Sequence, residues 1–225
     1  MFEPFRYLRV DSHTGYLWAT YRLRYSVYCI EKGFLDKDDY PNRLEVDAYD
    51  SYSLHFAAID EEDLVKGTLR LVTPTDGEKF PLEEHCALDI PVPPHTGEIS
   101  RVAISKRFRR PENPTSGDAF GLTIMTQDIE EDERKRVNRL RQTIILGLYI
   151  ALFQESKRVG ICNWLAAMEP SLARLMARQK IHFQQVGPEV DYYGKVYPYL
   201  LRGEDFESGL ARDNQALYQQ FVAGL

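Results

Sequence analysis

The chain has 225 residues, of which 44% are hydrophobic and 28% charged, a composition that allows one large domain with a substantial core. Its 28 Lys and Arg against 34 Asp and Glu give a formal net charge of −6, which argues against bulk attraction to nucleic acid. The longest apolar run, residues 144–153, is too short to span a bilayer, and the N-terminus lacks the apolar segment of a signal peptide. The three cysteines, Cys29, Cys86 and Cys162, are widely spaced and odd in number, as expected of reduced thiols. We therefore expect a cytoplasmic protein that binds no nucleic acid and has no integral membrane segment.

The first half of the chain predicts one helix followed by three strands. Apolar side chains recur at helical spacing over residues 15–32, and Gly33 follows that run. Residues 53–59 and 64–73 alternate between apolar and polar or small side chains around an acidic turn, which predicts a β-hairpin. A third strand rich in Ile and Val is expected over 97–107. The remaining segments are expected to be extended or irregular: residues 1–12, 34–50 and 76–94.

In the second half, a Pro/Gly/Ser-rich loop is predicted over residues 111–121. The longest helix is expected to start between residues 131 and 139 and to end at Arg158. After it we expect a short buried strand, a helix that opens with Pro170, two paired strands and a final helix, over residues 163–168, 170–180, 182–186, 196–201 and 207–222. This order predicts an α+β fold, with a mixed and mostly antiparallel central sheet flanked by helices.

Arg24 falls on the helix face that should pack inward. A buried guanidinium needs carboxylate partners, because an unpaired buried charge is very costly. The acidic segment that follows the helix offers Glu45, Asp47 and Asp50. Pairing of Arg24 with Asp47 or Asp50 would order a substrate-binding lid, whereas an arginine at the edge of the helix face would be solvated.

Charged residues also interrupt the predicted central strands. In a regular strand Glu98 and Ser100 would share one face and Arg101 would take the other. A β-bulge would change that relation and could expose backbone N–H groups to a ligand. Together with Arg70 on the preceding strand, these residues either meet around a cleft or are solvated on an edge strand.

Cations are concentrated on both sides of the predicted loop, which is unusual in an acidic chain. They could bind phosphate groups, assisted by the start of the longest helix, or form a solvated surface. Phe108 is the one aromatic residue interleaved with them, and a single aromatic side chain gives little support to stacking of single-stranded nucleic acid. The cations are Lys106, Arg107, Arg109 and Arg110, and then Arg134, Lys135, Arg136, Arg139 and Arg141. The five histidines show no metal-ligand spacing, so no metal site is expected.

An ordered set of these residues resembles the pattern of the acyl-homoserine-lactone synthases. The chain is also similar to N-acyl amino acid synthases and to exosortase (PEP-CTERM)-associated acyltransferases. The residues that carry the resemblance are Arg24, Tyr28, Phe34, the segment Glu45-Val-Asp-Ala-Tyr-Asp50, Arg70 and Glu98-Ile-Ser-Arg101.

The resemblance implies a GNAT-like acyltransferase domain over residues 1–203, followed by a C-terminal helical extension over 204–225. It also implies direct transfer of a fatty acyl group from a carrier thioester to an amine. Glu98 would be the general base, supported by Ser100 and Arg101. The substrate-binding residues would be Arg24, Tyr28, Phe34, Asp47, Asp50 and Arg70.

Two departures from these families bear on the substrates. Lactone synthases usually carry Phe and Trp where this chain has Tyr28 and Phe34, and the acetyltransferase pyrophosphate motif is missing. We therefore predict an N-acyltransferase with an amino-acid-like acceptor. The alternatives are a lactone synthase proper, an ordinary acetyl-CoA N-acetyltransferase, and a non-catalytic binding module with the same fold.

No tightly bound cofactor is expected, since acyl carrier protein (ACP) or CoA would bring the acyl group as a thioester substrate. Candidate donors to the leaving thiolate are Tyr192, Tyr193 and Tyr197, each of which could instead be a structural tyrosine. An apolar slot for the acyl chain could be lined by Leu148, Leu152, Trp164, Leu165 and Met168, or these residues could simply belong to the core. The cations expected to bind the acidic carrier or its phosphopantetheine phosphate are Lys106, Arg107, Arg109, Arg110, Arg136 and Arg139.

Overall fold

The structure is a computed structural model that describes residues 5–73, 79–106 and 125–225. Within these ranges, strands join in one sheet in the order β1-β2-β3-β4-β5-β8-β6, and β7 pairs with β8. All strand pairs are antiparallel except β4 and β5, which run parallel. The strands are β1 (Arg6–Arg9), β2 (Ser53–Ile59), β3 (Val65–Val72), β4 (Thr96–Ile104), β5 (Asn163–Met168), β6 (Gln184–Gln185), β7 (Val190–Asp191) and β8 (Lys195–Arg202). The predicted mixed, mostly antiparallel sheet is confirmed.

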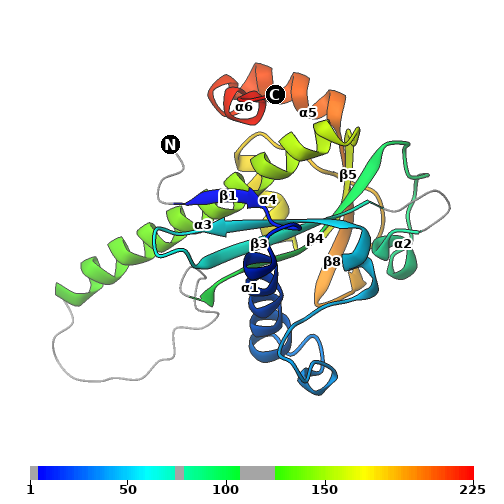
Figure 1. Ribbon diagram of the computed structural model, residues 1–225. Coiled ribbons are helices and arrows are strands. Elements are labelled where there is room, and N and C mark those ends of the chain that lie inside the picture. Colours follow the sequence, from blue (N-terminus) through cyan, green and yellow to red (C-terminus); the bar gives the residue numbers. More distant parts are fainter. Residues whose placement is uncertain (1–4, 74–78, 107–124) are drawn as a thin grey trace.

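Helices cover both faces of this sheet (Figure 1). Helix α1 (Thr14–Tyr25) continues into a π-helical turn, η1 (Ser26–Glu31), on one face. On the other face lies α3 (Met125–Arg158), together with α5 (Gly203–Asp213) and α6 (Gln215–Val222). The shorter helices are α2 (Pro81–His85), α4 (Pro170–Arg178) and the 3₁₀ helices η2 (Lys37–Asp39) and η3 (Ala48–Tyr52).

The main core lies between the sheet and α3. Successive strand residues point to opposite faces, so Leu69 and Leu71 of β3 pack with Leu148 of α3 in this core, whereas Arg70 lies between them in sequence and faces α1. Phe206 and Phe221, from α5 and α6, belong to the same core. The two C-terminal helices therefore complete the packing over α3. The division of the chain into residues 1–203 and 204–225 stays a prediction.

Three sequence predictions need correction. The longest helix begins at Met125 rather than between residues 131 and 139, and its charged early turns include an i,i+4 ion pair of Glu131 with Lys135. The stretch expected to be mostly irregular over 76–94 also contains the short helix α2, which was not predicted. The single final helix is two helices, because the side chain of Asn214 accepts a hydrogen bond from the Leu217 N–H and so caps a new helix.

The predicted loop over residues 111–121 lies outside the residues that the structure describes. Within the described part of the chain, no helix is both long and apolar enough to cross a membrane.

Gly147 allows α3 to approach β1 closely. A Cβ atom at this position would lie 2.0 Å from Cζ of Tyr7, whose hydroxyl donates to the Thr143 carbonyl at 2.9 Å. We expect Gly147→Ala to lower the free energy of unfolding by about 1–3 kcal/mol, because the methyl group overpacks this contact. Urea denaturation measures the change.

Gly209 in α5 provides the matched control for this prediction, because nothing lies within 4 Å of its added Cβ. Gly209→Ala is expected to raise stability by about 0.5–1 kcal/mol through helix propensity. If Gly147→Ala and Gly209→Ala changed the free energy of unfolding equally, the close contact between α3 and β1 would be contradicted.

Candidate active site

A β-bulge interrupts β4 opposite β3. The register passes from Arg70 opposite Ser100 to Thr68 opposite Ala103, which leaves one more residue on β4 than on β3. Arg101, within the bulge, has a φ of +51°. Ser100 and Arg101 therefore both face α1. In a regular strand they would face opposite sides of the sheet, and a bulge was predicted to change this.

Strands β4 and β5 separate just before this bulge. Their parallel pairing extends from Thr96 and Asn163 to Ile99 and Ala166, where it ends. Beyond that point a cleft of about 970 Å³ is lined by residues 98–104 of β4 and by the end of β5. Side chains from both faces of the sheet line this cleft, so it passes through the sheet.

On the α1 side of the cleft, six charged side chains form a closed ring in which guanidinium groups and carboxylates alternate. Their nitrogen–oxygen distances range from 2.5 Å for Arg70–Asp47 to 3.1 Å for Arg101–Glu45, and the Arg24–Glu45 pair closes the ring. In order around the ring, the residues are Arg24, Asp50, Arg70, Asp47, Arg101 and Glu45. We call this set the ionic ring.

Burial makes the pairing within the ionic ring obligatory. The side chains of Arg24, Arg70 and Glu45 are 1%, 0% and 0% exposed, and such charges are tolerated in an interior only when each is paired. Burial alone would raise the pKa of Asp50, but the hydrogen bonds and charge of Arg24 outweigh it and hold that pKa well below its usual range. The ring carries three positive and three negative charges, and is therefore neutral as a whole.

The ionic ring joins three parts of the chain. Glu45, Asp47 and Asp50 come from the segment between η1 and β2, while Arg70 and Arg101 come from the central strands. Asp47 also caps η3, because its carboxylate accepts from the Tyr49 N–H at 3.0 Å. The ring therefore fixes the acidic segment to the sheet, and its member Arg101 also lines the cleft.

Four members of the ionic ring were predicted to form a charged cluster, namely Arg24, Asp47, Asp50 and Arg70, and the structure brings them together. Arg24 pairs with Asp50 and not with Asp47. Glu45 was available in the acidic segment but had been given no role. Glu45 pairs with Arg24 and with Arg101, and the contact with Arg101 follows from the bulge.

Glu98 lines the cleft beside the ionic ring. Its side chain is almost fully buried, and one carboxylate oxygen accepts a hydrogen bond from the Leu82 N–H at 2.8 Å. Burial raises the pKa of Glu98 to about 8, although that hydrogen bond and the charges of Arg70 and Arg101 act in the opposite direction. A carboxyl group with this pKa can both accept and release a proton near neutral pH.

Ser100 and Arg70 link Glu98's strand to the ionic ring. The Ser100 hydroxyl accepts a hydrogen bond from Nε of Arg70 at 3.0 Å. Nη2 of Arg70 is buried and has no hydrogen-bond partner among the described residues. An unpaired buried N–H donor of a guanidinium is unusual in a folded protein. Arg70 itself does not line the cleft, but its Nε contacts Ser100, which does.

An aromatic cluster forms another wall of the cleft on the same side. The ring centroids of Tyr28, Phe34 and Tyr193 lie 6.3 to 6.5 Å from one another. The guanidinium carbon of Arg101 lies 5.6 Å from the Tyr28 centroid and 5.0 Å from that of Tyr193. Tyr28 and Phe34 were predicted to bind substrate, and the structure places both in the cleft wall.

Of the three tyrosines predicted as donors to the leaving group, two line the cleft and one does not. Tyr192 and Tyr193 are wall residues of the cleft. The hydroxyl of Tyr197 instead donates to Glu189 at 2.8 Å on the exposed surface. The prediction for Tyr197 is therefore wrong, because its position in β8 directs the side chain away from the cleft.

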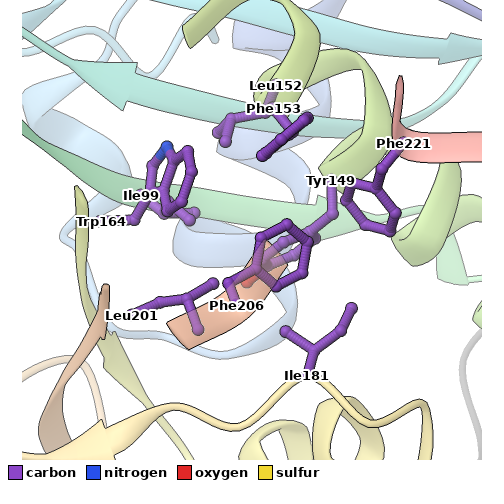
Figure 2. Close-up of a pocket in the computed structure, with 9 residues that line it drawn as sticks. All are labelled: Ile99, Tyr149, Leu152, Phe153, Trp164, Ile181, Leu201, Phe206 and Phe221. Carbon is purple, nitrogen blue, oxygen red and sulfur yellow. The ribbon is translucent and has the colours of Figure 1, made fainter. Parts of the chain in front are cut away.

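The α3 side of the cleft is lined by Arg141, Ile145 and Tyr149. A separate small cavity of about 10 Å³ shares Tyr149 with this wall and is lined by apolar and aromatic side chains (Figure 2). Leu152 and Trp164 line the small cavity.

The remaining residues expected in an acyl slot divide between the cleft and the core. Met168 lines the cleft. Leu148 and Leu165 line neither cavity, because Leu148 is buried in the main core and Leu165 faces the opposite side of the sheet. Helical and strand periodicity alone do not distinguish such core positions from cavity walls.

The predicted carrier-binding cations are only partly described. Lys106, Arg136 and Arg139 are exposed, and Lys106 also lines the cleft. Arg107, Arg109 and Arg110 lie outside the described residues. Arg141 was noted in the same basic stretch, and it lines the cleft. Carrier binding therefore stays a prediction. In the described ranges, no group of three or more His, Cys, Asp or Glu side chains is arranged to hold a metal ion.

Comparisons with known proteins agree with this architecture. A family model described as an acetyltransferase (GNAT) domain matches residues 23–116. TofI, solved in a ternary complex with an inhibitor and MTA, is 18% identical at a TM-score of 0.62, over 95% of this chain and 99% of that one. A search of curated proteins gave no match.

Two further solved structures are named as acyl-homoserine-lactone synthases. LasI is 16% identical at a TM-score of 0.56, over 94% of each chain. BjaI, a CoA-dependent synthase solved with SAM and isopentyl-CoA, is 16% identical at a TM-score of 0.60, over 99% of this chain and 90% of its own. At these identities the likeness shows a shared fold. The chain therefore has the GNAT-type fold of the acyl-homoserine-lactone synthases, and this fold and the family match together support an N-acyltransferase.

Proposed function

We propose that the protein transfers a fatty acyl group from a carrier thioester to the amine of an amino-acid-like acceptor. The observation that carries this proposal is the cleft between β4 and β5, which has a charged side and an apolar side. The ionic ring and Glu98 lie on its α1 side, and Ile145 and Tyr149 lie on its α3 side. An amine acceptor suits the first environment, and an acyl chain suits the second.

Glu98 is proposed as the general base. The acceptor amine is largely protonated at neutral pH and must lose a proton to attack the thioester carbonyl. Glu98, directly or through a water molecule, would take that proton, since burial raises its pKa to about 8. The neutral amine then attacks the thioester carbonyl to give a tetrahedral intermediate, which collapses to the amide as the carbon–sulfur bond breaks. The second amine proton passes to the leaving thiolate, and no covalent intermediate with the enzyme is required.

Backbone N–H groups of β4 are proposed to stabilise the oxyanion of the tetrahedral intermediate. β5 no longer pairs with β4 beyond Ile99, so donors of the bulged segment are free to face the cleft. Tyr192 and Tyr193 are the candidates to protonate the leaving thiolate, because both line the cleft.

The acceptor is proposed to bind between the aromatic cluster and the ionic ring. The unpartnered Nη2 of Arg70 provides a donor for a carboxylate or carbonyl oxygen of the acceptor. Tyr28 and Phe34 would contact its side chain. The ring itself, whose positive and negative charges balance, would hold this pocket in shape rather than attract charge.

Analysis of products by mass spectrometry tests this function directly. The protein is incubated with acyl-ACP and acyl-CoA donors, from acetyl to hexadecanoyl, and a mixture of amino acids and S-adenosylmethionine. We expect N-acyl amino acids with long acyl chains. Acyl-homoserine lactones would instead identify a lactone synthase proper, and acetylated products alone would exclude long-chain transfer. A protein that binds donors without forming any product would be a binding module.

Carrier docking is tested by reversing two of the exposed cations predicted to bind the carrier, with the double variant Arg136→Glu/Arg139→Glu. We expect binding of acyl-ACP to weaken at least tenfold at low salt, with a smaller difference at high salt, because surface charges steer an acidic partner. Surface plasmon resonance measures this affinity. The double variant Arg202→Glu/Arg212→Glu makes the same charge change at exposed residues of β8 and α5, and it should have little effect. Equal loss in both variants would contradict docking at the start of α3.

A further inference from the structure

We propose that Tyr149 sets the length of acyl chain that the cleft accepts, because it lies between the cleft and a small cavity lined by apolar side chains. This inference rests on the proposed function and extends it to the choice of donor. The ligand is an unbranched fatty acyl thioester, and the end of its acyl chain meets the ring of Tyr149.

Tyr149 and Ile99 are the two residues that line both the cleft and the small cavity. Figure 2 shows Tyr149 among the side chains that enclose the small cavity. The cavity holds about 10 Å³, which is at the lower limit for one water molecule. The two spaces are therefore neighbours, and a single aromatic ring together with one β4 side chain stands between them.

The path to this ring runs along α3. Arg141, Ile145 and Tyr149 line the cleft at intervals of four residues, so they lie one above another on one face of the helix. At a rise of about 1.5 Å per residue, Tyr149 lies about 12 Å along the helix axis from Arg141. A chain that enters at the charged end therefore meets Ile145 first and Tyr149 last.

A purely structural role for Tyr149 does not explain its hydroxyl group. Its oxygen is buried and has no hydrogen-bond partner among the described residues. By contrast, the hydroxyls of Tyr7 and Tyr28 donate to the carbonyls of Thr143 and Val102. A leucine would fill a core position without an unsatisfied polar atom. The ring of Tyr149 is held by packing, including an edge contact with Phe183 at 6.4 Å between centroids.

The space behind Tyr149 is built to receive an apolar chain. Phe153 and Trp164 come from α3 and β5, and the back wall is supplied by Phe206 of α5 and Phe221 of α6. Every one of these side chains is buried. Removal of the phenol ring of Tyr149 would join this cavity to the cleft and extend its apolar side by the volume of that ring.

Binding of a graded series of donors tests the inference. Isothermal titration calorimetry with acyl-CoA and acyl-ACP, from butanoyl to hexadecanoyl, is performed on wild type, Tyr149→Ala and Tyr149→Phe. In wild type we expect affinity to rise about fourfold for each added methylene and to stop rising once the chain end reaches Tyr149. In Tyr149→Ala the rise should continue to chains at least two carbons longer. Tyr149→Phe keeps the ring and should keep the wild-type limit.

Ile150→Ala serves as the control for a general loosening of the core. Ile150 follows Tyr149 in α3, is buried, and lines neither cavity. We expect it to lower stability without moving the chain-length limit. If Tyr149→Ala does not fold, Tyr149→Leu, which is smaller than tyrosine and apolar, should still shift the limit upward.

The outcomes separate this inference from the function on which it rests. An identical chain-length limit in wild type and in a folded Tyr149→Ala or Tyr149→Leu would overturn the role of Tyr149 and leave acyl transfer untouched. A chain-length limit that also moved in Ile150→Ala would overturn the role of Tyr149 as well. Failure of wild type to bind any acyl thioester would refute the proposed function, and the inference with it.

Discussion

Replacement of Arg70 by methionine is expected to lower the free energy of unfolding by about 3–5 kcal/mol, the range for breaking a buried ion pair. Arg70 is fully buried and bridges Asp47 and Asp50, at 2.5 and 2.9 Å. Without it the ionic ring opens and carries an unbalanced negative charge in the interior. Methionine has a similar length and is apolar, so the loss reflects charge rather than volume. Urea denaturation at neutral pH measures the change.

Arg6→Met is the matched control, because it also removes an arginine from an ion pair. The Arg6–Asp63 pair is exposed, with side-chain exposures of 58% and 64%. Pairs of this kind contribute about 0–1 kcal/mol, so the control should be close to neutral. If Arg70→Met lowered the free energy of unfolding no more than Arg6→Met does, the ionic ring would not be what fixes the acidic segment to the sheet.

Glu98→Gln is expected to lower kcat by a factor of about 10² to 10⁴, the usual contribution of a general base, with donor affinity unchanged. Glutamine has the same shape and keeps a carbonyl oxygen that can accept from the Leu82 N–H, now at 2.8 Å from the carboxylate. Steady-state kinetics and calorimetry of donor binding separate the two effects. In wild type, kcat should rise with pH and level off above about 8, because the base must be deprotonated and its pKa is about 8.

The free energy of unfolding should also respond differently to pH in wild type and in Glu98→Gln. The pKa of Glu98 is raised from 4.5 to about 8 in the folded protein, so between these values the folded state holds a proton that the unfolded state has lost. Stability of wild type should therefore fall relative to Glu98→Gln as pH rises through this window, and the difference should become constant above it. Thermal unfolding at several pH values measures this. Glu62→Gln, at an exposed position, should show neither effect.

A kcat for Glu98→Gln within a factor of about three of wild type would remove Glu98 as the base. The pH profile provides an independent check on the same assignment. A profile without a rise near pH 8 would mean that another group limits the reaction, whereas loss of that rise in Glu98→Gln would link it to this carboxyl.

Local sequence patterns were sufficient to predict most of the elements. Alternation over 53–59 and 64–73 predicted the hairpin of β2 and β3, and helical spacing predicted α1 and most of α3. These patterns are short-range, since burial on one face repeats every two residues in a strand and about every 3.6 in a helix. The predictions were wrong where a side chain, and not the periodicity, sets the end of an element. The Asn214 cap between α5 and α6 is an example.

The order of residues also showed which charges needed an explanation. Arg24, Arg70 and Glu98 stand in segments that must pack inward, so each had to find a partner or face a cleft. The partners themselves follow from contacts between distant segments. The β3–β4 register creates the bulge that turns Arg101 toward Glu45, and burial raises the pKa of Glu98. Tyr149 follows the same helical period as a core residue, and only the packing of β4, α5 and α6 around it distinguishes a wall between two cavities from ordinary core. Such contacts join residues far apart in the chain, and no local repeat encodes them.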